Sequence, residues 1–293
     1  MATIVSVGSG KGGTGKSVVV TNLACLLAQR GEKVCLVDLD VGGANAHIMF
    51  GRFDPPVTLT DFLVRKAASL DEIVLDVPPF KNLGIIVGTG ETLRSANMPY
   101  ATKQRLIRHL GKLNADIVLI DVGAGTNYNA LDFFMMGDYH LCVTTPEPTA
   151  TLDLYRFIKL SVVRKMLSSF VAYEAISPIL AKSDFKTVRD IYRRAEEVNA
   201  ESRHRAEAAL KGFRPMLVVN QRAPGSLFSV QRLEQLMAEY LDLKLVKLGE
   251  IPLDDAVKES VRHFMPVCEM NPNASSSKAM HAIADVLLRK LHR

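Results

Sequence analysis

The chain has 293 residues, of which 48% are hydrophobic and 23% charged, and its formal net charge is +5 at pH 7. This length and apolar content suffice for a large buried core, and no apolar run approaches the ~20 residues that a membrane span needs. The first residues form a strand-like run rather than a basic segment followed by an apolar one, so we expect no secretory signal and a cytoplasmic location.

The start of the chain combines an apolar run at Thr3–Val7, a glycine-rich loop and an amphipathic stretch at 18–30. These predict a buried strand, a turn and a helix that ends at Gly31. From Gly10 the loop has the pattern G-x-x-x-x-G-K-S, in which backbone N–H groups surround phosphate oxygens at a helix N-terminus. Lys16 would contact the β- and γ-phosphates, and Ser17 would hold Mg²⁺.

We therefore expect this loop to bind a nucleoside triphosphate. The alternative is a glycine-rich turn that binds nothing. The expected contacts are Gly10, Lys11, Gly12, Gly13, Thr14, Gly15, Lys16, Ser17 and Val18.

Strand-like and helical patterns alternate along the chain. Continuous apolar runs predict strands buried on both faces at Thr3–Val7, Lys33–Asp38, Leu83–Val87, Asp116–Asp121, Tyr139–Thr145, Pro215–Asn220 and Leu245–Gly249. Helices are expected at Ser17–Arg30, Tyr100–Leu113, Asn129–Met136, Thr151–Ser169, Phe185–Leu210, Ser229–Leu241 and Ser275–Leu291. This alternation predicts an α/β fold with a doubly wound, mostly parallel sheet of about seven or eight strands and helices on both faces. We expect one domain over residues 1–293.

A helical insertion is expected at about 170–211, because this segment is long for a connection between a helix and a strand. Between Arg156 and Arg214 the sequence has 13 Lys or Arg and 7 Asp or Glu, against 23 and 24 elsewhere. One interpretation is a solvated helix with many salt bridges. The other is a basic protrusion that meets an anionic surface or a partner protein.

Lys11 is a second cation on the phosphate loop, and two ammonium groups so close repel unless a polyphosphate lies between them. The run K-G-G-T-G-K-S resembles the deviant phosphate loop of the MinD/ParA family, K-G-G-x-G-K-[ST]. The resemblance implies an ATPase that binds ATP or ADP with Mg²⁺ and forms an ATP-sandwich homodimer. In that dimer Lys11 would contact the partner subunit's γ-phosphate and, with Lys16, stabilise charge during hydrolysis.

Two further motifs extend the resemblance. The run from Asp38 to Asn45 is similar to the family's first switch, D-x-D-x-G-x-x-N. By resemblance Asp40 positions the attacking water, Asp38 assists at the metal, and Asn45 lies near the nucleotide. Four apolar residues precede Asp121, which would hold Mg²⁺ through water, while Gly123 would allow close approach to the γ-phosphate. The alternative for Asp121 is a helix cap after a strand.

Later loops supply the remaining expected contacts. The segment from Thr144 resembles the family's T-x-P-E motif, and the position of Asp153 matches an interface residue that pairs with the signature lysine when the partner is absent. The alternative for Asp153 is an exposed residue at a helix start. Asn220 would pair with adenine, or serve only as a strand-end turn residue. Pro252 and Asp254 lie in a loop that resembles I-P-x-D-x-x-V, which packs on the base.

The four cysteines are far apart and form no C-x-x-C pair, which favours buried thiols. None lies in the turn after Asp121, so we expect no iron–sulfur cluster between subunits. The chain looks most like the MinD and FlhG members of the family, which are spatial regulators. We therefore expect a slow ATPase that dimerises on ATP and switches its binding to a protein partner or activator.

Two alternatives remain open for the function. One is ATP-dependent, non-specific DNA binding of the ParA kind through the basic region at 156–214. The other is a protein adaptor that the nucleotide gates without significant turnover. Peripheral binding to a membrane or to the nucleoid is compatible with the leading hypothesis.

The last predicted helix carries an apolar stripe formed by Met280, Ile283, Ala284, Leu287, Leu288 and Leu291. This stripe predicts packing against the core. The alternative is membrane binding, for which the basic flank would be Lys278, Arg289, Lys290 and Arg293.

Overall fold

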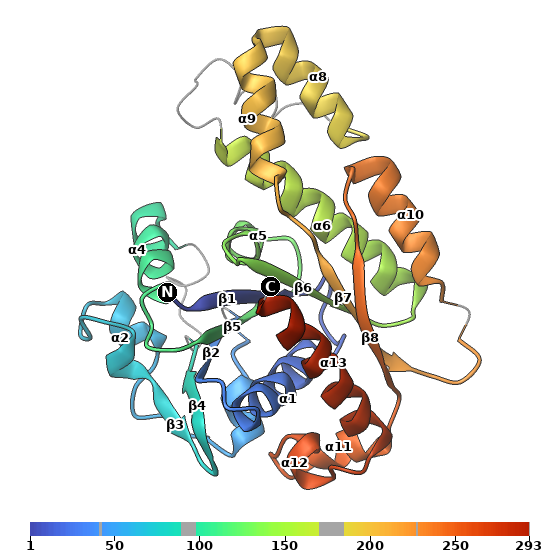
Figure 1. Cartoon of the computed structure of the whole chain (residues 1–293). Helices are drawn as coiled ribbons and strands as arrows, with labels where there is room; N and C mark the ends of the chain where they lie inside the picture. Colours follow the sequence, from blue (N-terminus) through green and yellow to red (C-terminus); the bar gives the residue numbers. More distant parts are fainter. Residues whose placement is uncertain (41–42, 89–97, 170–184, 227, 293) are drawn as a thin grey trace.

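The computed structural model describes residues 1–40, 43–88, 98–169, 185–226 and 228–292. Its centre is an eight-stranded sheet with the order β3-β4-β2-β5-β1-β6-β7-β8 (Figure 1). All neighbours are parallel except β3 and β4, which are antiparallel. The strands are β1 (Thr3–Gly8), β2 (Val34–Leu39), β3 (Leu75–Val77), β4 (Phe80–Ile86), β5 (Ile117–Val122), β6 (Tyr139–Thr144), β7 (Met216–Arg222) and β8 (Val246–Pro252).

Helices cover both faces of this sheet, as the doubly wound prediction required. On one face α1, α12 and α13 pack on a core that includes Val5, Leu23 and Leu119. The elements of this side are α1 (Lys16–Gln29), the 3₁₀ helix η1 (Ala46–Phe50), α11 (Asp255–Arg262), α12 (Val267–Met270) and α13 (Ser275–Leu291).

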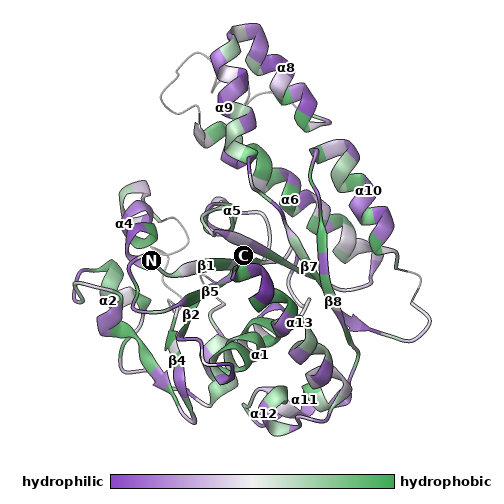
Figure 2. Ribbon diagram, in the orientation of Figure 1, coloured by the Kyte–Doolittle hydropathy of each residue, from purple (hydrophilic) through white to green (hydrophobic). Residues whose placement is uncertain are grey.

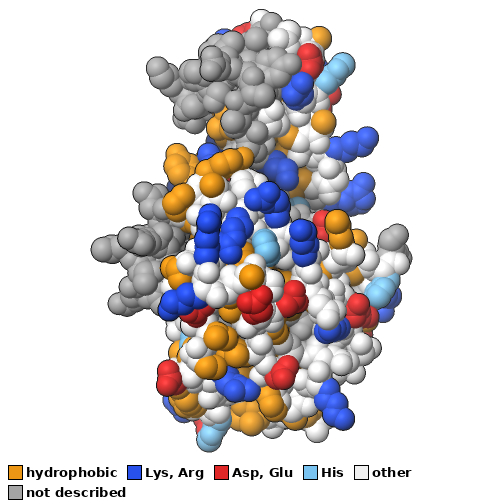
Figure 3. Space-filling view, turned by 90° about the vertical axis from the view of Figure 1, so that its left-hand side faces the viewer, with side chains coloured by type: hydrophobic (Ala, Val, Ile, Leu, Met, Phe, Trp, Pro, Cys, Tyr) orange, Lys and Arg blue, Asp and Glu red, His pale blue; other side chains and the backbone are white. Residues whose placement is uncertain are grey.

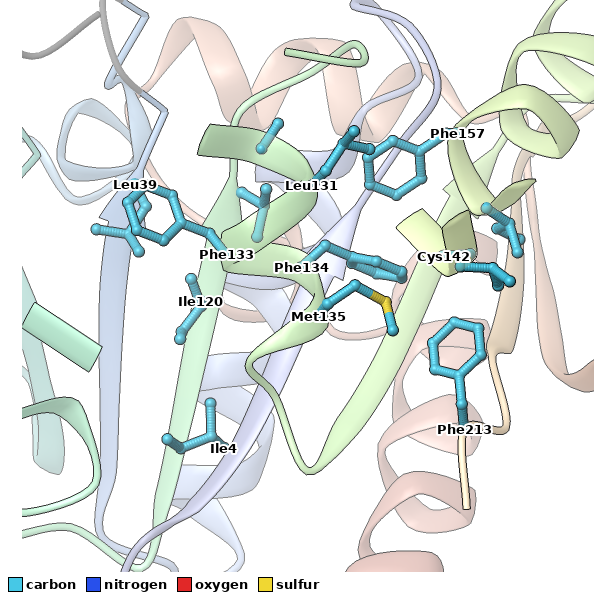
Figure 4. Packing of buried hydrophobic residues seen from close by; sticks show 14 of the residues in the cluster. Ile4, Leu39, Ile120, Leu131, Phe133, Phe134, Met135, Cys142, Phe157 and Phe213 are labelled. Atoms are coloured by element: carbon cyan, nitrogen blue, oxygen red, sulfur yellow. The ribbon is translucent and has the colours of Figure 1, made fainter. Parts of the chain in front are cut away.

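The opposite face carries a second core. Phe134, Phe157 and Phe213 belong to it, with Phe134 and Phe157 ring centroids 4.8 Å apart, and Figure 4 shows the buried side chains between the helices and the sheet. The helices here are α2 (Leu59–Leu63), α4 (Tyr100–Leu110), α5 (Tyr128–Met135), α6 (Pro148–Ser169) and α10 (Val230–Leu241), with the 3₁₀ helix η2 (Asp71–Ile73) beside them.

The predicted insertion forms a pair of helices, α8 (Val188–Val198) and α9 (Ala200–Leu210), beyond the end of α6 (Figure 1). We expected one helix over this span, but Asn199 is extended and its side chain accepts a bond from the Ser202 N–H, so it caps a new helix. The expected piece at 171–181 lies outside the described residues.

Both helices of the pair are hydrophilic over much of their surface (Figure 2). Their arginines pair with neighbouring carboxylates, in the bridges Arg193–Asp190, Arg194–Glu197, Arg203–Glu196, Arg203–Glu207 and Arg205–Glu201. The described part of the insertion therefore matches the interpretation as a solvated helix with many salt bridges. Lys and Arg side chains also gather below this pair, across the middle of the face drawn in Figure 3.

The last helix, α13, belongs to the core. Met280, Ile283, Ala284 and Leu287 are buried, and Leu288 and Leu291 pack against the same cluster. The apolar stripe of α13 is therefore covered by protein, which confirms the core interpretation and makes this stripe unavailable for membrane binding. Within the described parts of the chain, no helix has both the length and the apolar character to cross a membrane.

Candidate functional site

The carboxyl ends of the three central strands bring the sequence motifs together. Asp121 on β5 is aligned with Val7 on β1 and with Asp38 on β2. Each aspartate follows a run of buried apolar residues and is the second-last residue of its strand, so the two carboxylates lie near the carboxyl edge of the sheet. Ligands of open α/β sheets bind at this edge.

The backbone of the phosphate loop is fixed from two sides. Gly13 and Gly15 have φ of 80° and 77°, the left-handed region that glycine adopts without strain. A Cβ at Gly10 would lie 2.1 Å from the backbone carbonyl carbon of Asp153, so the loop rests on the first turns of α6. From the other side, the Asn220 amide donates to the Thr14 carbonyl at 2.9 Å.

Lys16 and Ser17 both contact Asp121. The Lys16 ammonium forms an ion pair with one carboxylate oxygen, and the Ser17 hydroxyl donates to the other at 2.7 Å. Lys16 and Asp121 are almost fully buried, at 6% and 1% side-chain exposure. The carboxylate thus neutralises the lysine that phosphate oxygens would otherwise approach, and it holds the hydroxyl that was predicted to bind the metal.

Asp38 is a buried carboxyl group with a raised pKa. It accepts backbone bonds from Asp40 and Ala46, each 3.0 Å long. Burial raises the pKa of Asp38 to about 7, and the neighbouring Asp121 adds to the shift. Asp40 is half-buried, and desolvation raises its pKa also, against the opposing charge of Lys16. Its carboxylate lies against Gly123, where a Cβ would be 2.9 Å from Oδ1.

This burial predicts a pH-dependent effect of Asp38→Asn on stability. Because the folded pKa exceeds the ordinary value of 3.8, the unfolded chain ionises first as the pH rises, and the carboxylate destabilises the fold increasingly up to about pH 7. Asp38→Asn has no carboxyl group to ionise and is not destabilised in this way. The free energy of unfolding of Asp38→Asn, measured relative to that of the unchanged protein, should therefore rise by about 2 kcal/mol from pH 5 to pH 8.

Urea denaturation of the nucleotide-free protein at both pH values measures this difference. The loss of one hydrogen-bond acceptor is common to both pH values and cancels. Asp54→Asn, at an exposed carboxylate, is the control and should show no such trend. A stability difference for Asp38→Asn that stays constant with pH would contradict the assignment.

Lys11 differs from Lys16 in its ion-pair partner and in its exposure to solvent. Its ammonium lies 2.9 Å from the Glu147 carboxylate and 3.2 Å from the Thr149 hydroxyl, and its side chain is 33% exposed. The expected pairing with Asp153 is not found, because Asp153 bonds to Arg156 at 3.3 Å and turns its backbone toward Gly10. Glu147, from the turn before α6, is the partner that we did not assign, although it stood in the quoted T-x-P-E motif.

The other expected nucleotide contacts lie around the same edge. Asn45 is exposed at the start of η1. Pro252 ends β8, and the next residue, Leu253, donates its N–H to Arg222. The Asp254 carboxylate accepts bonds from Ala256, Ser275 and Ser276, which hold its pKa at about 2.

Asp254 and Asn220 therefore have structural bonds already, and their contact with a nucleotide stays a prediction. Gln221 was not expected at the site. Its amide lies 3.5 Å from the Gly13 carbonyl, and its position next to Asn220 at the strand end was the signal for it.

The oxygen donors at this edge fit Mg²⁺ that arrives with a nucleotide. Ser17, Asp38 and Asp121 supply hard oxygen ligands, which magnesium prefers, and it commonly takes few protein ligands and keeps waters and phosphate oxygens. Among the described residues, no three His, Cys, Asp or Glu side chains are grouped to hold a metal alone. The four cysteines are buried and free.

Comparison with known families agrees with this geometry. The model of the CobQ/CobB/MinD/ParA nucleotide binding domain matches residues 5–267. The chain belongs to this family. The phosphate loop, Asp38 and Asp121 all lie within the matched residues.

Relatives of this family resemble the chain over most of its length. The antiactivator FleN of Pseudomonas aeruginosa is 26% identical over 96% of this chain and 84% of its own length. The flagellum site-determining protein YlxH of Helicobacter pylori is 28% identical over 89% and 87%. The septum site-determining protein MinD of Pyrococcus horikoshii, solved with Mg-ADP, has the same fold, with a TM-score of 0.68 and 23% identity over 98% and 96%.

Proposed function

We propose that this protein binds Mg-ATP, forms an ATP-sandwich homodimer, and hydrolyses ATP slowly to switch its binding to a partner. The observation that carries the proposal is the contrast between its two loop lysines. Lys16 is buried against the chain's own Asp121, whereas Lys11 is one-third exposed and held by Glu147, which is itself 62% exposed. A lysine in this position can leave its carboxylate and reach a phosphate of a second subunit.

The remaining residues have complementary roles in this proposal. Lys16 would bind the β- and γ-phosphates in place of the Asp121 carboxylate, and Ser17, Asp38 and Asp121 would hold the metal ion. Bound Mg²⁺ neutralises charge on the phosphate oxygens. Asp40 faces the Gly123 turn and orients the attacking water, and Lys11 of the second subunit stabilises the charge that develops in the transition state.

Spatial regulation is the cellular role that we infer. The relatives that cover most of the chain are an antiactivator and a flagellum site-determining protein, and a shorter match is a septum site-determining protein. These names favour a regulator of flagellar number or placement or of the division site, and cargo positioning is the alternative role. A protein partner that stimulates hydrolysis is part of the proposal, with a membrane or the nucleoid as the surface.

Light scattering coupled to size-exclusion chromatography tests the dimer. Asp40→Ala should bind Mg-ATP without turnover and elute as a dimer. The double variant Lys11→Ala/Asp40→Ala should stay monomeric, because the lysine that reaches the second subunit is gone, while its nucleotide affinity changes by no more than about threefold.

The matched control is Lys66→Ala/Asp40→Ala, which removes a lysine that is 76% exposed, and it should dimerise like Asp40→Ala. A monomeric Asp40→Ala at saturating Mg-ATP would contradict the dimer. Dimerisation of the Lys11→Ala double variant would contradict the role of Lys11.

A further inference from the structure

A groove open to solvent lies away from the nucleotide edge. It has a volume of about 590 Å³ and is lined by Tyr192 of α8, by the C-terminal part of α9, and by the residues that follow α9 and α10 and lead into β7 and β8. Because Met216 begins β7 and Val246 begins β8, the groove stands at the amino ends of the strands. A second cavity of about 230 Å³ shares Lys211, Gly212 and Phe213 with it.

Three basic side chains line the groove. The side chains of Lys211, Arg214 and Lys244 are exposed and form no ion pair or hydrogen bond with any residue that the structure describes. The carboxylates of the same groove are engaged: Glu207 bonds to Arg203 at 2.9 Å, and Asp242 lies 4.0 Å from Arg189. The uncompensated charge of the groove is therefore positive.

Two apolar residues, Phe213 and Leu243, belong to the lining of the groove. Phe213 and Leu243 are buried, and the Phe213 ring packs against His140 with centroids 4.6 Å apart. Figure 4 shows Phe213 pointing into the core cluster. The Phe213 N–H donates to the Leu210 carbonyl, and the Leu243 N–H donates to the Met237 carbonyl. These two bonds fix the backbone that follows α9 and the backbone that follows α10. Three separated cations beside these apolar residues match a ligand that carries several negative groups and an apolar side chain.

We propose that this groove binds an acidic peptide segment of a partner protein. A small molecule would need a more enclosed cavity. A nucleic acid would bring an unbroken row of phosphates against Glu207 and Asp242, whereas a peptide can set its carboxylates at the cations and an apolar side chain at the apolar residues of the groove. Lys211 and Lys244 also follow helix C-termini, where positive charge is favourable. Replacing them could therefore lower stability, and the test measures peptide binding and folding separately.

Fluorescence anisotropy with a labelled peptide tests the proposal. The probe is the peptide Glu-Glu-Leu-Glu-Asp-Phe-Glu-Glu, and its isosteric control has Gln and Asn at the acidic positions. Lys211→Glu/Arg214→Glu/Lys244→Glu should weaken binding of the acidic peptide at least tenfold. The control variant Lys81→Glu/Lys278→Glu/Arg289→Glu makes the same change in net charge at exposed sites elsewhere and should stay within about twofold.

Thermal unfolding of both triple variants shows whether they are folded. If charge reversal prevents folding, Lys211→Gln/Arg214→Gln/Lys244→Gln takes its place, with the same loss expected. Equal losses in the groove and control variants, or no binding of the acidic peptide to the unchanged protein at millimolar concentration, would overturn the proposal. Duplex DNA that binds the groove more tightly than the peptide would also overturn it. The assay needs neither nucleotide nor dimer, so its failure leaves the proposed ATPase function untouched.

Discussion

Lys16→Ala should abolish Mg-ATP binding and also destabilise the nucleotide-free protein. The substitution removes the cation that binds the phosphates. It also leaves Asp121, with 1% side-chain exposure, without its ion-pair partner and next to the buried Asp38. Breaking a buried pair by removing one partner costs about 3–5 kcal/mol. Titration with a fluorescent ATP analogue measures the first effect, and urea denaturation measures the second.

A second buried ion pair provides the matched control. Lys103 on α4 bonds to Asp132 at 2.6 Å, with side-chain exposures of 8% and 19%. Lys103→Ala should lower the free energy of unfolding by less than Lys16→Ala, because Asp132 keeps its 2.9 Å bond to Arg164. Its nucleotide affinity should be unchanged. Equal losses of nucleotide binding in the two variants would mean that Lys16→Ala acts only through stability.

The position of the two buried aspartates could be predicted from the sequence. In a parallel sheet the strands are buried on both faces, so an apolar run that ends in Asp places the carboxylate at the carboxyl edge. Asp38 and Asp121 follow this rule, and the alignment of β2 with β5 then makes them neighbours. Local patterns were sufficient here because β2 and β5 are parallel neighbours whose last residues are aligned.

The partners of individual side chains could not be predicted in the same way. Lys11 meets Glu147 rather than Asp153 because the backbone of α6 passes close to Gly10, a tertiary contact that no spacing in the sequence contains. The short strand β3 was missed because Leu75–Val77 pairs only at the edge of the sheet, with a register shift. The break at Asn199 was missed because charged helical residues continue on both sides of it.

Gly10→Ala should disable the phosphate loop, although alanine is the smallest possible change. Its Cβ would lie 2.1 Å from the carbonyl carbon and 2.2 Å from the carbonyl oxygen of Asp153, and 2.4 Å from the Leu154 nitrogen. These neighbours are backbone atoms of α6, whose Leu154 side chain is fully buried. The helix cannot yield, so the loop must move, at a cost of about 1–3 kcal/mol.

Gly12→Ala separates this contact from a general effect of losing a loop glycine. A Cβ at Gly12 meets nothing within 4 Å, and its φ is not among the positive values of the described glycines. Gly12→Ala should therefore change the free energy of unfolding by no more than about 0.5 kcal/mol. Urea denaturation of both variants without nucleotide isolates the contact between the loop and α6. Equal destabilisation by the two substitutions would show that α6 does not set the position of the loop, whereas loss at Gly10 alone ties the nucleotide site to the helix that carries Asp153.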